Sequence, residues 1–163
     1  MKTKLISIIL LIVPKLLFAV EVNCAFEEVY KNGQFQTGFF LINENYLRYQ
    51  YNNQNLFTIF YDRENVTIVK NNNRKEISIN NQYKELFKML FSILGNYPEL
   101  ENNIKTNNYS ISLEKSLSVN FYKRVSIISN QLNMSISIND CNFNSINKLF
   151  FKTDPVFEYK FYN

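Results

Sequence analysis

The chain has 163 residues, of which 46% are hydrophobic and 16% aromatic, enough to close the core of one domain. Its formal charge of +4 arises largely in the first fifteen residues, because without Lys2, Lys4 and Lys15 only 15 basic residues stand against 14 acidic ones. This balance argues against a nucleic-acid partner. The absence of histidine excludes Ser-His-Asp and Cys-His catalysis and most zinc sites.

The first nineteen residues indicate a signal peptide. Lys2 and Lys4 form a positive start, residues 5–13 are apolar apart from one serine, and Ala19 offers the small residue that signal peptidase requires. The alternatives are an uncleaved membrane anchor and a buried core helix. A spanning helix needs about 20 apolar residues, whereas a proline and a lysine at 14–15 end this stretch. We therefore expect export to the periplasm and one domain over the remainder, 20–163.

Two cysteines, Cys24 and Cys141, follow this leader. Exported proteins meet an oxidising compartment, in which cysteines pair. A bond would link the start of the domain to one of its last strands. The sequence leaves two alternatives open, a disulfide or two buried thiols.

The chain after residue 24 shows the period-two alternation and the polar, Asn-rich turns of short strands. Because no helices separate most of these strands, they predict an antiparallel meander. The expected strands cover residues 25–30, 35–42, 46–51, 56–61, 65–70, 77–79, 109–113, 117–122, 125–129, 132–138 and 146–151.

Two strands differ in their pattern. Residues 132–139 place Leu, Met and two Ile on one face and only Asn and Ser on the other, which indicates a sheet covering a single core. Residues 56–61 are apolar on both faces, so this part of the sheet should be covered on both sides.

One amphipathic helix is expected over residues 81–94, followed by Gly95. It must lie on the apolar face of the sheet, either as a plug of the core or as a lid over a cavity. Its apolar stripe consists of Tyr83, Leu86, Phe87, Leu90, Phe91 and Leu94.

Catalytic motifs are absent from the sequence. It contains no CxxC, P-loop or dinucleotide-binding glycine motif. Glu27 and Glu28 could suggest an acid–base pair, but neighbouring residues of a strand point to opposite faces. We predict neither an enzyme nor a metal or cofactor site. Fifteen Phe and eleven Tyr are more than a small β domain must bury, which favours binding of an apolar ligand, although strands also use such residues to fill a core.

Several short motifs occur together: Phe26-Glu27-Glu28, the turn Asn32-Gly33, Gly38-Phe39-Phe40-Leu41, Leu47-Arg48-Tyr49, Thr58-Ile59-Phe60-Tyr61-Asp62 and the closing Phe157-Glu158-Tyr159. In this order they resemble the periplasmic outer-membrane lipoprotein carrier proteins (the LolA-like family), in a diverged or shortened form. The resemblance implies a curved antiparallel sheet, an incomplete β-barrel, with the helix packed on its concave face.

The resemblance also implies a function. Such carriers accept lipoprotein acyl chains from an inner-membrane ABC exporter and deliver them to an outer-membrane receptor. The expected ligand is therefore lipoprotein acyl chains or lipid, and the expected state is a monomer. The cavity lining implied in this way is Phe39, Leu41, Leu47, Tyr49, Tyr51, Phe57, Ile59, Leu86, Phe87, Leu90 and Phe91.

Two other functions stay open. The chain could be an exported β-domain that acts as an envelope interaction or assembly module, with a filled core and no lipid ligand. An enzyme would require opposed carboxylates in a cleft, which a sequence does not display. An apolar cavity between helix and sheet would favour the carrier over the interaction module.

Overall fold

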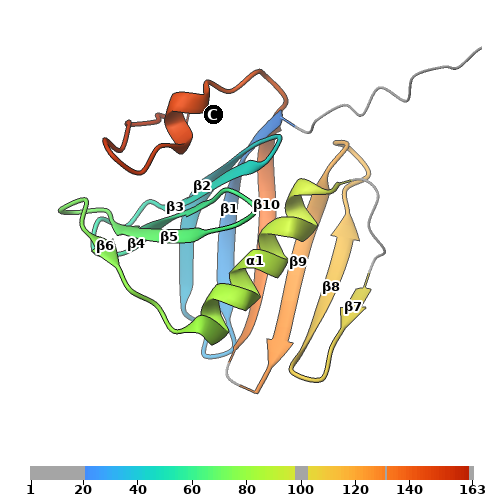
Figure 1. Cartoon of the computed structure of the whole chain (residues 1–163). Helices are drawn as coiled ribbons and strands as arrows, with labels where there is room; N and C mark the ends of the chain where they lie inside the picture. Colours follow the sequence, from blue (N-terminus) through green and yellow to red (C-terminus); the bar gives the residue numbers. More distant parts are fainter. Residues whose placement is uncertain (1–20, 98–102, 131, 162–163) are drawn as a thin grey trace, which may run out of the picture.

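A computed structural model describes residues 21–97, 103–130 and 132–161 of the chain, without the side chain of residue 82. The predicted signal peptide lies outside these residues. The described part forms one curved antiparallel sheet that is not closed into a barrel, with one α-helix across its concave face (Figure 1), as the sequence predicted. Its strands are β1 (Glu21–Tyr30), β2 (Phe35–Asn43), β3 (Tyr46–Tyr51), β4 (Phe57–Tyr61), β5 (Val66–Lys70), β6 (Glu76–Ile77), β7 (Asn103–Lys105), β8 (Tyr109–Lys115), β9 (Tyr122–Ser129) and β10 (Asn133–Asn142).

The strand order is β6-β5-β4-β3-β2-β1-β10-β9-β8-β7. The chain therefore builds the sheet outward from β1, crosses the concave face in α1 (Asn81–Gly95), and returns from the opposite edge to pair β10 with β1. This central pair contains an irregularity in register between Asn23 and Ala25, where Asp140 has a left-handed φ of 49°. Within this irregularity Cys24 and Cys141 form a disulfide, the first of the two alternatives left open by the sequence.

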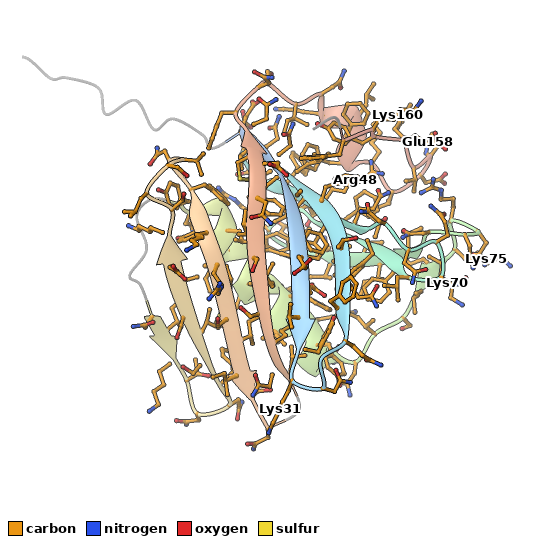
Figure 2. The ribbon with its side chains drawn as sticks, turned by 180° about the vertical axis from the view of Figure 1, so that it is seen from behind. Lys31, Arg48, Lys70, Lys75, Glu158 and Lys160 are labelled. Atoms are coloured by element: carbon orange, nitrogen blue, oxygen red, sulfur yellow. A yellow bond between two sulfur atoms is a disulfide. The ribbon has the colours of Figure 1, made fainter. Side chains whose placement is uncertain are left out.

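The two faces of the sheet carry two apolar cores. The larger one lies between the concave face and α1, and its strand residues include Phe26, Phe40 and Tyr49. The smaller one lies on the convex face, where residues 143–161, here called the C-terminal strap, cover Phe39 and Leu41 (Figures 1 and 2). The strap contains one short 3₁₀ helix, η1 (Lys148–Phe151).

The two strand patterns singled out in the sequence are confirmed. In β10, Met134, Ile136 and Ile138 are buried in the larger core, and the residues between them are at least partly exposed. In β4, Ile59 is buried on the concave face and Phe60 on the convex face, so this strand is covered on both sides.

The helix begins where predicted and continues one residue further, to Gly95. Its C-terminal half carries the buried residues Leu90, Phe91 and Leu94. Tyr83, at the start of the predicted apolar stripe, is 45% exposed, because the first turn of α1 lies at the rim of the concave face rather than over its centre (Figure 1).

Two predicted strands are wrong. Residues 117–122 do not form a strand of their own, because Ser116 Oγ accepts hydrogen bonds from the backbone amides of Ser118 and Val119 and thereby fixes a turn before β9. Residues 146–151 instead contain η1, whose first turn is capped by the Asn147 side chain accepting from the Leu149 amide. Strand β7, at the sheet edge, was missed because it is only three residues long.

Gly38 of β2 is required by packing. A Cβ atom at this position would collide with the backbone carbonyl of Gln50 in β3 and with the ring of Phe26. The glycine thus allows the Phe26 ring to lie flat against the sheet, where it stacks on Tyr49 with ring centroids 4.0 Å apart.

Candidate functional site

The concave face beneath α1 brings together nine of the eleven side chains predicted to line a cavity. Six are buried in the larger core and three are partly buried against it: Leu47, Tyr49, Tyr51, Ile59, Leu90 and Phe91, with Phe57, Leu86 and Phe87. The prediction for Phe39 and Leu41 was wrong in its choice of face. These two alternate with the concave-facing Phe40 and Ile42, so they point to the convex side and pack under the strap.

Aromatic rings from α1 and from the sheet pack against one another in the larger core. The Phe91 ring of α1 lies 6.3 Å from the Tyr49 ring and 5.6 Å from the Tyr61 ring, centroid to centroid. Phe40 continues this layer toward Phe121, at 5.9 Å. In this state the interior is a packed core, and a long acyl chain could enter only if α1 moved.

A cleft of about 290 Å³ opens between the C-terminal half of α1 and the ends of β2, β3 and β4. We call it the mouth cleft. Two of the predicted cavity residues, Leu47 and Phe91, lie in its wall. Its lining consists of Ile42, Glu44, Asn45, Tyr46, Leu47, Tyr61, Arg63, Phe91, Ser92, Gly95 and Asn96. No sequence pattern marked Tyr46 or Tyr61 as cleft residues, because their role depends on where the strand ends meet the helix.

A second cleft, of about 390 Å³, lies on the strap side of the same strand ends. We call it the back cleft. It is bounded by Phe151 and the three residues after it in the strap, and by side chains of β3, β4, β5 and the turn between the last two. Tyr46 and Tyr61 line both clefts and therefore form the wall between them.

Glu28 is the buried acid of the concave face, with only 2% of its surface exposed. Three tyrosine hydroxyls donate to its carboxylate: Tyr30 and Tyr49, each at 2.6 Å, and Tyr51 at 3.0 Å. Burial raises the pKa of Glu28 above its ordinary value, and the three hydrogen bonds offset only part of this rise. Burial, reinforced by the charge of Glu28, in turn raises the pKa of Tyr49.

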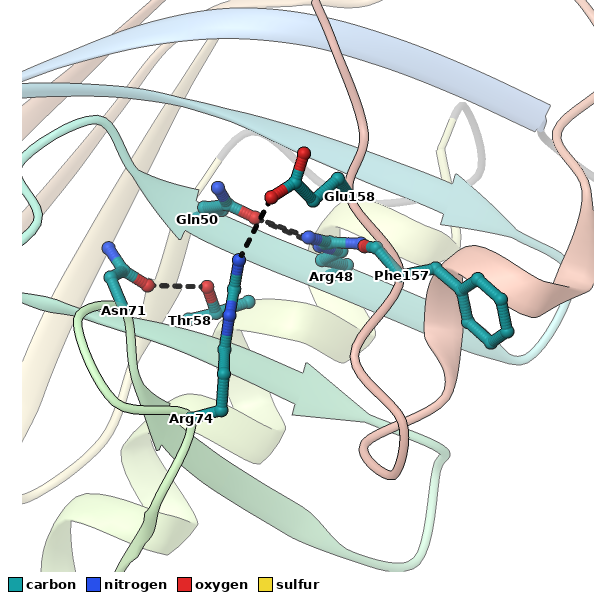
Figure 3. A network of polar contacts seen from close by, with 7 residues as sticks. All are labelled: Arg48, Gln50, Thr58, Asn71, Arg74, Phe157 and Glu158. Carbon is teal, nitrogen blue, oxygen red and sulfur yellow. Dashed lines mark hydrogen bonds and ion pairs between the residues drawn. The ribbon is translucent and has the colours of Figure 1, made fainter.

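Arg48 is the buried base of the convex face, 1% exposed. Its guanidinium donates to the backbone carbonyls of Phe150 and Phe157 in the strap, at 3.0 and 2.7 Å, and to the Gln50 side chain (Figure 3). Within the described residues no carboxylate pairs with it. Burial, with a smaller contribution from the charge of Arg74, lowers the pKa of Arg48 to about 10.

Further contacts hold the strap against the sheet. The Asn43 side chain donates to the Ile146 carbonyl at 2.7 Å, and the Asn23 side chain donates to the Tyr159 hydroxyl at the same distance. Viewed from the convex side, Arg48, Glu158 and Lys160 lie in one region of the molecule (Figure 2). Glu158 forms an exposed ion pair with Arg74 at 3.9 Å.

The site offers little to a metal. Among the described residues no group of three or more His, Cys, Asp or Glu side chains could hold a metal ion. The same residues include no helix long and apolar enough to cross a membrane.

Neither a scan against protein-family models nor a search of curated proteins found a match to the chain. The resemblance to lipoprotein carriers therefore rests on the sequence motifs alone.

Proposed function

We propose that the protein is an exported carrier that binds the acyl chains of lipoproteins or lipids between α1 and the concave face of the sheet. One observation carries this proposal: the mouth cleft opens between the helix and the sheet and reaches the apolar side chains of Leu47 and Phe91. The proposal includes no catalytic step and needs no cofactor.

The cleft is at the lower limit of ligand-pocket size, about 300 Å³, so a lipoprotein anchor with several chains requires α1 to move aside. The helix is suited to such movement because its N-terminal half is poorly covered: Leu86 and Phe87 are only partly buried, and Tyr83 is exposed. Each methylene that enters would contribute about 0.8 kcal/mol. Ten methylenes would supply about 8 kcal/mol, which corresponds to a micromolar Kd before the cost of displacing the helix.

The disulfide between Cys24 and Cys141 supports export, because such bonds persist in oxidising compartments. Together with the predicted leader, it supports a periplasmic location, which is part of this proposal. Its partners there would be an inner-membrane ABC exporter that loads it and an outer-membrane receptor that unloads it, and it would act as a monomer.

The proposal can be tested by blocking the mouth cleft. Ser92 lines this cleft on α1, whereas Ser112 is exposed on β8, outside the lining of the cleft. The variants Ser92→Cys and Ser112→Cys would each be labelled with a bulky maleimide and titrated with a fluorescent fatty acid. We expect the label at position 92 to abolish uptake and the label at position 112 to leave it unchanged.

Equal uptake by both labelled variants would show that acyl chains do not enter through this cleft. A protein that takes up no fatty acid even without a label would instead be the interaction module. The close ring packing between α1 and the sheet is the observation that favours this second candidate.

A further inference from the structure

We propose that the C-terminal strap, although it lies on the convex face, sets the opening of the mouth cleft on the concave face, with Phe151 acting through Tyr46 as the positioning residue. This inference rests on the proposed carrier function and adds a control element to the same site.

The two tyrosines that separate the clefts, Tyr46 and Tyr61, pack against different elements. The Tyr61 ring packs against Phe91 of α1, at 5.6 Å between centroids. The Tyr46 ring packs instead against Phe151 of the strap, at 5.8 Å. One side of the mouth cleft is therefore held by the helix and the other by the strap.

Tyr46 depends on this support because of its position. It is the first residue of β3, directly after the turn Glu44–Asn45, and it is 37% exposed. In the described part of the chain, Phe151 is the one aromatic ring packed against it. Phe151 itself is buried, so it provides a fixed surface for the tyrosine ring.

The strap contacts the turn before Tyr46 as well. The buried Asn43 side chain donates to the Ile146 carbonyl at 2.7 Å, and Glu44 forms an ion pair with Lys148 at 3.4 Å. These strap residues precede Phe151 by five and three positions. One short segment therefore holds Asn43, which precedes the mouth cleft in the chain, and Glu44 and Tyr46, which line it. The exposed ion pair adds little, and the buried hydrogen bond and the ring contact carry most of the support.

Arg48 fixes the strap on both sides of the back cleft. Its guanidinium donates to the carbonyls of Phe150 and Phe157. These residues lie one position before Phe151 and six positions after it. The segment between these anchors forms one wall of the back cleft. A partner that entered the back cleft and shifted this segment would therefore remove the support of Tyr46 and widen the mouth.

Two neighbouring phenylalanines provide a matched test. The Phe151 ring faces Tyr46, whereas the Phe150 ring faces Tyr159 within the strap, at 5.0 Å. The association rate of a fluorescent fatty acid would be measured by stopped flow for the wild type, Phe151→Ala, Phe150→Ala and the ring-conserving Phe151→Tyr. Urea unfolding of the same variants would report their stability.

We expect Phe151→Ala to speed association about 2- to 12-fold. This factor corresponds to the free energy of one aromatic pair. Phe150→Ala should lose similar stability and keep the wild-type rate, and Phe151→Tyr should keep the rate too. An unchanged rate in Phe151→Ala, or the same increase in both alanine variants, would overturn the inference and leave the carrier function standing. A wild type that binds no fatty acid would overturn the carrier function, and this inference with it.

Discussion

Removing the disulfide should cost the protein a large part of its stability. Cys24 and Cys141 join β1 to β10, the first and last strands among the described residues. The bond closes a loop with a sequence separation of 117 residues. The chain-entropy relation gives a loss of about 4.9 kcal/mol for a loop of this length. Domains of this kind are stable by about 5–15 kcal/mol, so the crosslink supplies a third or more of the total.

The test is urea unfolding of the wild type and of the double variant Cys24→Ala, Cys141→Ala. Because the chain has no tryptophan, far-UV circular dichroism is the suitable signal. With a denaturant slope of about 2 kcal/mol per molar, the midpoint should fall by about 2.5 M. The wild type in excess reductant should fall to a similar midpoint, whereas reductant should leave the double variant unchanged.

A midpoint that fell by less than about 0.5 M would contradict this reasoning, since the relation allows no such small effect for a long loop. It would mean that the unfolded chain already holds β1 and β10 together, or that the pair is not bonded in the native protein.

Three other substitutions test separate parts of the structure. Gly38→Ala should destabilise the protein by about 1–3 kcal/mol, because the Gln50 backbone cannot move away from a new Cβ atom. Gly95→Ala should be neutral or stabilising, because a Cβ atom there would have nothing within 4 Å. Equal unfolding midpoints for the two variants would refute this expected difference. Arg48→Leu should lower the free energy of unfolding by about 2–4 kcal/mol, since two strap carbonyls lose a charged donor. It should also speed limited proteolysis of the strap. A strap cleaved at the wild-type rate would count against the role of Arg48 as its anchor. Because the pKa of Glu28 is raised, the folded protein binds this proton more tightly than the unfolded chain, so wild-type stability should fall as pH rises above 4.5. Glu28→Gln should flatten that slope in urea titrations across pH, and parallel curves for the two proteins would contradict the burial of a titrating carboxyl.

The sequence predicted the concave side of the fold well, because the signal there is local. Strict alternation in β10 and the helical spacing of Leu90, Phe91 and Leu94 follow from period alone. The bounds of β3 agree with the prediction to the residue, since polar turns flank it on both sides.

The convex side could not be predicted in this way. The residues of the strap form no regular pattern, because after η1 they contact the sheet through single side chains and backbone carbonyls rather than through a ladder. Residues 146–151, four of which are apolar, therefore suggested a strand. Phe39 and Leu41 were assigned to the cavity because nothing in the sequence indicated that a distant segment would cover the other face.

The environments of the two buried charged residues could not be predicted from the sequence either. Glu28 and Arg48 lie on opposite faces of the sheet, and neutral groups from other strands and from the strap satisfy their hydrogen bonds. Glu28 was considered only as half of an acid–base pair with Glu27, and the tyrosines that surround it come mainly from β3, two strands away.

The most direct test of the carrier function is native mass spectrometry of the mature protein purified from the periplasm of a bacterial host, with lipid extraction of the same sample. For a carrier we expect a species heavier than the protein by an acyl-bearing ligand, and recovery of that ligand in the extract. A ligand-free mass, from a protein that also fails to take up a fluorescent fatty acid, would contradict the carrier function and leave the aromatic layer beneath α1 as a filled core.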